Sequence, residues 1–168
     1  MANAIVKIAD MVGPVLIQQD NNTEELFNPL RNELEGMFLR RLMGIELGNL
    51  FLASVQVSGV PPSGRFLTIF SPIQENLNGF EVDSQGIKEM LKCILYFYYA
   101  RDNNVRVTLA GNVNQKGENS TPNSDNFNLT KTYNKGIEIA QTIQFYIGQK
   151  LDVYPEYKGQ KLRMAIGI

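Results

Sequence analysis

The side chains that could carry chemistry are few, and histidine is absent from the 168-residue sequence. Histidine supplies most general bases and many metal ligands near neutral pH, so serine–histidine and cysteine–histidine catalysis are excluded within this chain. The single cysteine, Cys93, lies in the apolar run MLKCILYFYYA, which is typical of a small core hydrophobe. One cysteine also excludes a disulfide scaffold and a cysteine-based zinc site. Carboxylate pairs and lysines are the groups left for catalysis.

The remaining charged motifs have simpler structural interpretations. Arg40-Arg41 could contact a phosphate or a carboxylate, but two arginines at a helix end also suit the helix dipole, which is the interpretation we favour. The segment GVPPSGR lacks the Gly-Lys-Ser/Thr ending with which a nucleotide loop contacts phosphate and metal. We therefore expect no enzyme activity, no cofactor and no metal site. The acidic residues near the first helices are interpreted as solvated surface: Glu24, Glu25, Glu33, Glu35 and Glu46.

Composition indicates one globular domain with 43% hydrophobic and 20% charged residues. The net charge is −1, from 16 basic and 17 acidic residues, so the chain has no global attraction for nucleic acid. No apolar run approaches the roughly 20 residues of a membrane helix, and the start MANAIVKIADMVGPV does not resemble a secretory signal. We expect a protein that is made in the cytoplasm and does not contact a membrane.

Helical periodicity then defines the elements that position these side chains. A first helix is expected from the N-cap Asn28 and Pro29 to about Gly44, followed by a short helix in IELGNLFLASV. The segment VSGVPPSG is a loop, RFLTIF is a strand or an extended connector, and SPIQENLNG has turn chemistry. A long helix begins at Asp83 or Ser84 and ends near Arg101. The last helix runs from residue 126 or 128 to residue 146 or 148.

The stretch 102–126 is long and polar, and it opens with an alternating run in which Val105, Val107 and Leu109 fall on one side. Structureless loops of this length are uncommon in compact domains unless they are functional or disordered. We interpret this stretch as a subunit–subunit loop that a neighbour orders.

The two ends of the chain form arms around a helical domain at 24–148. Residues 1–23 contain short β-leaning runs, and residues 149–168 form an apolar tail that alternates like a strand. Such a tail suggests addition to a sheet edge, either in its own fold or on a partner. We expect the stretch 102–126 and the tail to stay mobile until a partner binds, and deletion of residues 162–168 to abolish that binding without unfolding the protein. The proposed docking residues are Leu162, Arg163, Met164, Ile166 and Ile168.

The expected fold class is therefore mainly α, with a bundle of three to four helices, an extended β-like loop and extended N- and C-terminal arms. Two segments resemble one protein family. FNPLRNELEGMFLRRLMGIELGNLFL at 27–52 resembles the opening helices of head–tail connector (portal adaptor) proteins of tailed bacteriophages, especially Bacteroidetes and crAss-like phages. Residues 91–147 resemble the aromatic helix of that family, its extended loop with Lys-Gly-Glu-Asn-Ser, and its closing helix.

The resemblance implies a structural virion protein of the neck that binds the portal in about twelve copies. Further neck or tail proteins would bind it, and DNA would pass through its channel without sequence-specific contacts. The family has no catalytic residues to transfer. One alternative is another neck protein, such as a stopper or tail terminator. A second is a small-molecule-binding regulatory domain whose pocket wall is formed by Tyr96, Tyr98 and Tyr99.

Overall fold

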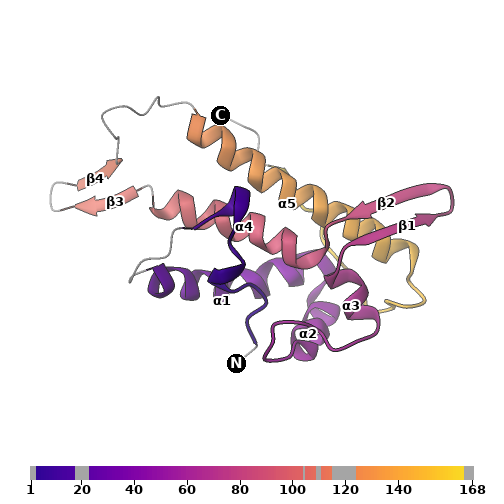
Figure 1. Cartoon of the computed structure of the whole chain (residues 1–168). Coiled ribbons are helices and arrows are strands. Elements are labelled where there is room, and N and C mark those ends of the chain that lie inside the picture. Colours follow the sequence, from indigo (N-terminus) through magenta and orange to yellow (C-terminus); the bar gives the residue numbers. More distant parts are fainter. Residues whose placement is uncertain (1–2, 18–22, 104, 109–110, 115–123, 165–168) are drawn as a thin grey trace.

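The computed structural model describes residues 3–17, 23–103, 105–108, 111–114 and 124–164. These residues confirm the expected mainly α fold, in which helices dominate and the strands form two separate antiparallel hairpins (Figure 1). The elements in chain order are η1 (Ile8–Asp10), η2 (Gly13–Val15), α1 (Thr23–Met43), α2 (Ile45–Ser54), α3 (Arg65–Phe70), β1 (Ile73–Leu77), β2 (Phe80–Ser84), α4 (Gly86–Asn103), β3 (Val105–Thr108), β4 (Gly111–Asn114) and α5 (Ser124–Gln149).

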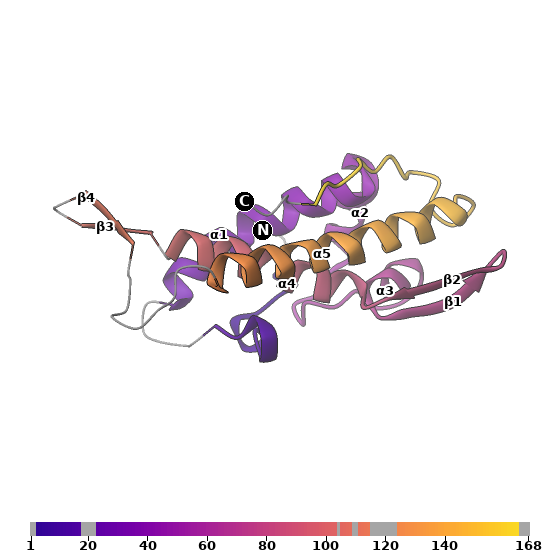
Figure 2. The same cartoon turned by 90° about the horizontal axis from the view of Figure 1, so that it is seen from above.

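The pair α4 and α5 forms the centre of the bundle, and α1 packs against it (Figure 2). A Cβ atom at Gly136 of α5 would lie 3.1 Å from Cys93 Cβ and 3.2 Å from Ile94 Cγ1 of α4. A glycine inside a helix costs about 1 kcal/mol relative to alanine. Gly136 is therefore explained by the close approach of the two helices. From α1, Phe38 also packs against α4, with its ring centroid 6.0 Å from that of Tyr98.

The first helix begins five residues before the expected Asn28, at Thr23, so Pro29 lies inside α1 rather than at its first position. The upstream turn buries Thr23 and Phe27, which are 1% and 0% exposed. The Phe27 ring packs edge-on against Tyr99 of α4, with centroids 6.0 Å apart. Burial of this turn favours helix on the N-terminal side of Pro29, although proline contributes no N–H to it.

The segment RFLTIF is a helix, α3, and not the expected strand or connector. Its apolar residues Phe66, Ile69 and Phe70 recur at helical spacing, and Ile69 and Phe70 are buried. Phe66 contacts Phe51 of α2, with ring centroids 5.5 Å apart. With only six residues, the segment is too short for its period to be distinguished from a strand by sequence.

The segment SPIQENLNG contains a strand as well as a turn, because β1 pairs with β2 in register from Ile73↔Ser84 to Leu77↔Phe80. The turn is Asn78-Gly79, with φ of 53° and 86°. Positive φ at both central residues is the requirement of the tight turn that Asn-Gly favours. The two expected helix caps, Asp83 and Ser84, both lie in β2, and α4 begins at Gly86, whose N–H donates to the Ser84 hydroxyl at 3.3 Å.

A second hairpin, β3–β4, follows the end of α4 and projects from the bundle (Figure 1). It confirms a strand at Val105 and Val107, whereas Leu109 lies outside the described residues. Ordering of this hairpin by a neighbouring subunit stays a prediction.

The N-terminal arm does not extend away from the bundle. Its described residues fold into the turns η1 and η2, and they bury Ile5, Val6 and Met11 in the main core. Among the described helices, none is long and apolar enough to cross a membrane.

Candidate docking surface

The N-terminal arm is held by a carboxylate of α1. Glu35 is 5% exposed, and its Oε2 and Oε1 atoms accept hydrogen bonds from the backbone N–H groups of Ile5 and Val6 at 3.2 and 2.7 Å. Burial raises the pKa of Glu35, while the two N–H groups act in the opposite direction by stabilising the carboxylate. The expectation that Glu35 is solvated surface is therefore wrong, because this carboxyl group replaces water as the partner of two buried N–H groups.

The periodicity of α1 contained a signal for this role. Glu35 precedes Leu39 by four residues and Leu42 by seven, and both leucines are 0% exposed. A carboxylate at this position shares the buried stripe of the helix. Buried charged groups need hydrogen-bond partners, but the sequence does not indicate which segment supplies them.

The C-terminal tail is held by the opposite end of α1. The last carbonyl groups of a helix lack partners within it. Here Met43 O accepts from the Lys158 N–H at 3.0 Å, and Arg41 O accepts from the Gln160 N–H at 2.8 Å. Leu42 O accepts from the Gln144 side chain of α5 at 2.9 Å. The tail therefore caps α1 and fills the space between α1 and α5.

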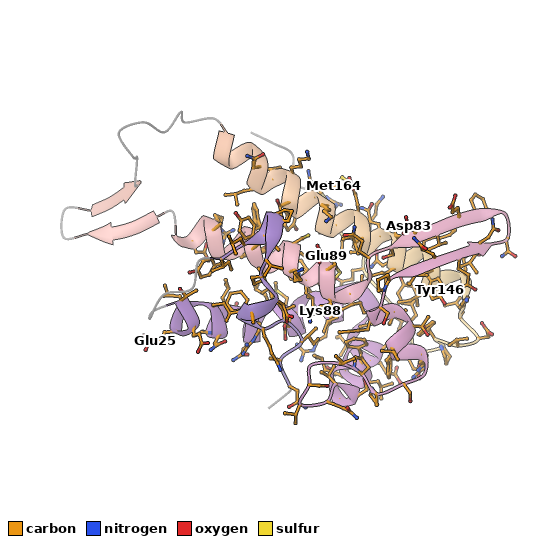
Figure 3. All side chains as sticks on the ribbon, viewed as in Figure 1. Glu25, Asp83, Lys88, Glu89, Tyr146 and Met164 are labelled. Carbon is orange, nitrogen blue, oxygen red and sulfur yellow. The ribbon has the colours of Figure 1, made fainter. Side chains whose placement is uncertain are left out.

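This capping corrects the expectation of a mobile tail for residues 150–162. Leu162 is 6% exposed, belongs to the main core, and its carbonyl accepts a hydrogen bond from Gln141 of α5 at 3.1 Å. Its side chain is therefore held by the protein's own fold. Arg163 and Met164 follow this anchor and are exposed, and Met164 lies beside α5 (Figure 3). Ile166 and Ile168 lie outside the described residues.

A second clamp fixes the start of the tail to α3. The Arg65 guanidinium binds both carboxylate oxygens of Glu156, at 2.8 and 2.9 Å, and also donates to Val153 O at 2.8 Å. The buried Tyr154 hydroxyl donates to Arg65 O at 2.8 Å. The hydrogen bond and charge of Arg65 lower the pKa of Glu156 below its ordinary value of 4.5.

We expect Glu156→Gln to destabilise the fold at neutral pH by about 1 kcal/mol or less, as is usual for a partly exposed ion pair. Because the folded-state pKa is lowered, this stability is present above the ordinary pKa of 4.5 and is lost as the pH falls through the folded value. Urea unfolding curves of the two proteins should differ at neutral pH and converge in acid. A difference that persists in strong acid would contradict this prediction.

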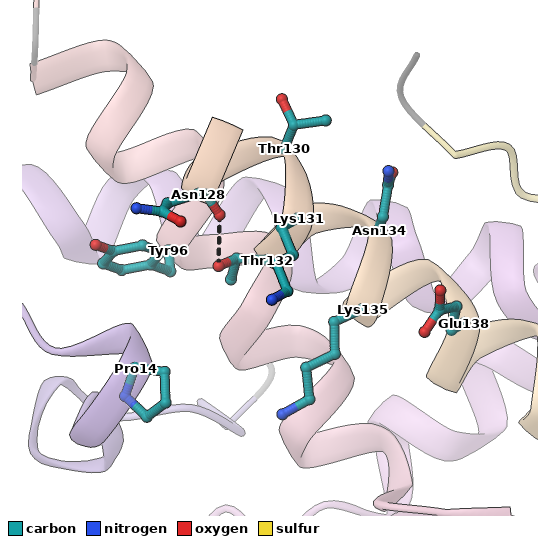
Figure 4. Close-up of a pocket in the computed structure, with 9 residues that line it drawn as sticks. All are labelled: Pro14, Tyr96, Asn128, Thr130, Lys131, Thr132, Asn134, Lys135 and Glu138. Atoms are coloured by element: carbon teal, nitrogen blue, oxygen red, sulfur yellow. Dashed lines mark hydrogen bonds between the residues drawn. The ribbon is translucent and has the colours of Figure 1, made fainter. Parts of the chain in front are cut away.

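A groove of about 840 Å³ runs along the N-terminal half of α5 (Figure 4). Tyr96 of α4 and Pro14 of η2 form its apolar wall. Of the three tyrosines considered as a pocket wall, only Tyr96 lines this groove, since Tyr98 and Tyr99 pack against phenylalanines of α1. The α5 side chains that line the groove are Asn128, Thr130, Lys131, Thr132, Asn134, Lys135 and Glu138.

An exposed aromatic pair lies at the other half of α5. Phe80 of β2 is 63% exposed and Phe145 of α5 is 39% exposed, with ring centroids 6.0 Å apart. The opposite face of the hairpin is polar, because Glu81 and Asp83 are exposed and pair across the strands with Asn76 and Gln74.

Cys93 is 1% exposed, and burial raises the pKa of its thiol to about 11, so it stays protonated and unreactive at neutral pH. The part of the chain that the structure describes contains no cluster of three metal-ligating side chains. Comparison with protein-family models, curated proteins and solved structures finds no match for this chain.

Proposed function

We propose that the chain is a non-catalytic assembly subunit of the neck of a tailed phage, a head–tail connector that joins the portal to the tail. The resemblance of residues 27–52 and 91–147 to that family supports the assignment. The observation that carries it is the exposed Phe80–Phe145 pair, in which two large aromatic rings contact each other at the surface. Aromatic rings are enriched at protein interfaces, and an apolar cluster rimmed by polar residues is typical of a surface that a partner covers.

The tail supplies the contact with the portal in this proposal. Leu162 is anchored in the core, so the segment that follows it starts from a fixed point. Arg163 and Met164 begin that segment and are exposed. A segment presented from a rigid base loses less conformational entropy on binding than a tail that is free along its whole length.

The test is an affinity pull-down of the tagged protein from bacteria in which the phage is assembling, with mass spectrometry of the bound proteins. We expect the portal and other neck proteins to bind the full-length chain, and the portal to be lost from a variant that ends at Leu162. The cut is placed after Leu162 because removal of that residue would damage the core. Recovery of the full-length protein alone, or with metabolic proteins only, would overturn the proposal.

Two other functions predict different results in the same experiment. A stopper or tail terminator would bind neck or tail proteins but not the portal. A small-molecule-binding domain is favoured by the groove of about 840 Å³ beside Tyr96, and it would be recovered as a monomer without virion proteins.

A further inference from the structure

Two lysines of α5, Lys131 and Lys135, present positive charge in the groove, which the exposed carboxylate of Glu138 also lines. Lys131 is exposed and forms no hydrogen bond or ion pair with the described part of the chain. Lys135, one helical turn further on, reaches only Glu89, at 3.5 Å, and Glu89 is already bound at 2.8 Å by Lys92. The groove therefore favours a partner with two negative charges about 6 Å apart, the rise of four residues in a helix.

The hairpin β1–β2 carries such a pair on its outer face. Glu81 and Asp83 are exposed, and neither forms an ion pair with the residues that the structure describes. They are two residues apart in β2, so they point to the same side, with a spacing of about 6.7 Å along the strand. Their cross-strand neighbours Asn76 and Gln74 add amide groups to this face.

We propose that the outer face of the β1–β2 hairpin in one copy docks in the α5 groove of a second copy, with Glu81 and Asp83 opposite Lys131 and Lys135. The spacing of the two lysines along α5 and that of the two carboxylates along β2 agree within about 1 Å. The hydroxyl and amide groups of the groove face the hairpin amides, and the ring of Tyr96 covers one side of the contact. This inference rests on the proposed assembly function and assigns the surfaces through which the copies meet.

An exposed acidic pair at the start of α1 fits the groove less well. Glu24 and Glu25 begin α1, but adjacent residues of a helix point about 100° apart. They cannot both face two lysines that lie on one side of α5. The hairpin pair is therefore the better match within the described residues.

The proposed contact joins two different surfaces, so each copy can donate its hairpin to one neighbour and accept a hairpin from another. Such heterologous contacts produce rings when the rotation between copies closes. Figure 3 shows Asp83 on the hairpin, and Figure 4 shows Lys131 and Lys135 at the opposite half of α5. The net charge of −1 implies that association depends on these local charges and not on a global attraction.

Charge reversal on each surface, followed by mixing, tests this contact. We expect Lys131→Glu/Lys135→Glu and Glu81→Lys/Asp83→Lys each to weaken self-association at least about tenfold, because like charges then meet in the interface. An equimolar mixture of the two variants should associate again, since every hairpin then finds a groove of opposite charge. Analytical ultracentrifugation at two salt concentrations measures both effects, and salt should weaken the wild-type complex.

Matched controls separate this contact from a general effect of charge. Lys161→Glu and Asp152→Lys make the same changes at exposed positions outside both surfaces, and they should associate like the wild type. Lys131→Glu alone replaces the double variant if the loss of the Lys135–Glu89 contact unfolds the chain, as circular dichroism would reveal.

The inference is overturned if the wild type remains monomeric at high concentration, if the reversed variants associate normally, or if the mixture fails to recover. A portal pull-down with the same variants distinguishes the two proposals. Portal capture by variants that associate normally would sustain the connector function and reject this interface.

Discussion

Replacement of Glu35 by alanine is expected to lower the free energy of unfolding by about 3 kcal/mol and to release the N-terminal arm from α1. The substitution leaves the buried N–H groups of Ile5 and Val6 without a partner, and each unsatisfied group costs about 1–3 kcal/mol. The unpaired N–H groups favour movement of the arm away from α1 towards water. Movement of the arm would in turn expose the apolar side chains of Ile5 and Val6.

Glu33→Ala is the matched control, because Glu33 is an exposed carboxylate two residues earlier in the same helix. We expect it to change stability by less than about 0.5 kcal/mol. Urea unfolding measures both variants, and hydrogen exchange at Ile5 and Val6 reports the arm directly. Equal stabilities for the two variants, or unchanged protection of those two amides in Glu35→Ala, would show that Glu35 does not hold the arm.

The long helices could be predicted from sequence because their own periodicity determines them. The stripes of α4 and α5 recur at three- and four-residue steps, and the structure buries Ile87, Leu91 and Ile94 together with Ile137, Ala140 and Ile143. Gly136 also fits this account, since its cost of about 1 kcal/mol inside a helix is accepted where a neighbour packs closely. The helix that packs against Gly136 is determined by the tertiary structure, so the local sequence does not identify it.

The errors occurred where tertiary contacts override local preference. Pro29 looks like a first helical residue, yet burial of Phe27 extends α1 by a turn on its N-terminal side. The Asn78-Gly79 dipeptide was a hairpin signal, but β1 has three exposed residues in succession and so lacks a clear alternation of burial. The strand-like tail binds α1 through backbone N–H groups, which every residue except proline possesses, so no side-chain pattern indicates it.

The candidate docking surface could be predicted only in part. The helical spacing of Lys131 and Lys135 and the strand spacing of Glu81 and Asp83 can be read once the elements are known. No strand was expected at residues 80–84, so the acidic pair Glu81 and Asp83 was not recognised. Glu35 was missed because carboxylates are usually solvated, and only its place on the apolar stripe of α1 indicates otherwise.

Replacement of Gly159 by alanine is expected to lower the free energy of unfolding by about 2–4 kcal/mol and to detach the tail. A Cβ atom at this position would overlap Leu42 O and would lie 2.7 Å from the Tyr157 ring. The tail must then move away from α1 and lose the hydrogen bonds that Lys158 and Gln160 donate, worth about 1 kcal/mol each. Exposure of Leu162 adds about 2 kcal/mol.

Gly148→Ala is the matched control, because it makes the same change inside α5 where a Cβ atom meets nothing within 4 Å. Alanine there should stabilise the helix by up to about 1 kcal/mol. The free energy of unfolding should therefore rise in Gly148→Ala and fall in Gly159→Ala. Urea unfolding and hydrogen exchange at Lys158 and Gln160 measure the difference, and stabilisation by both substitutions would refute the packing argument. Gly159→Ala retains every residue after Leu162, so a loss of portal binding in this variant would show that the anchored position of the tail is required in addition to its sequence.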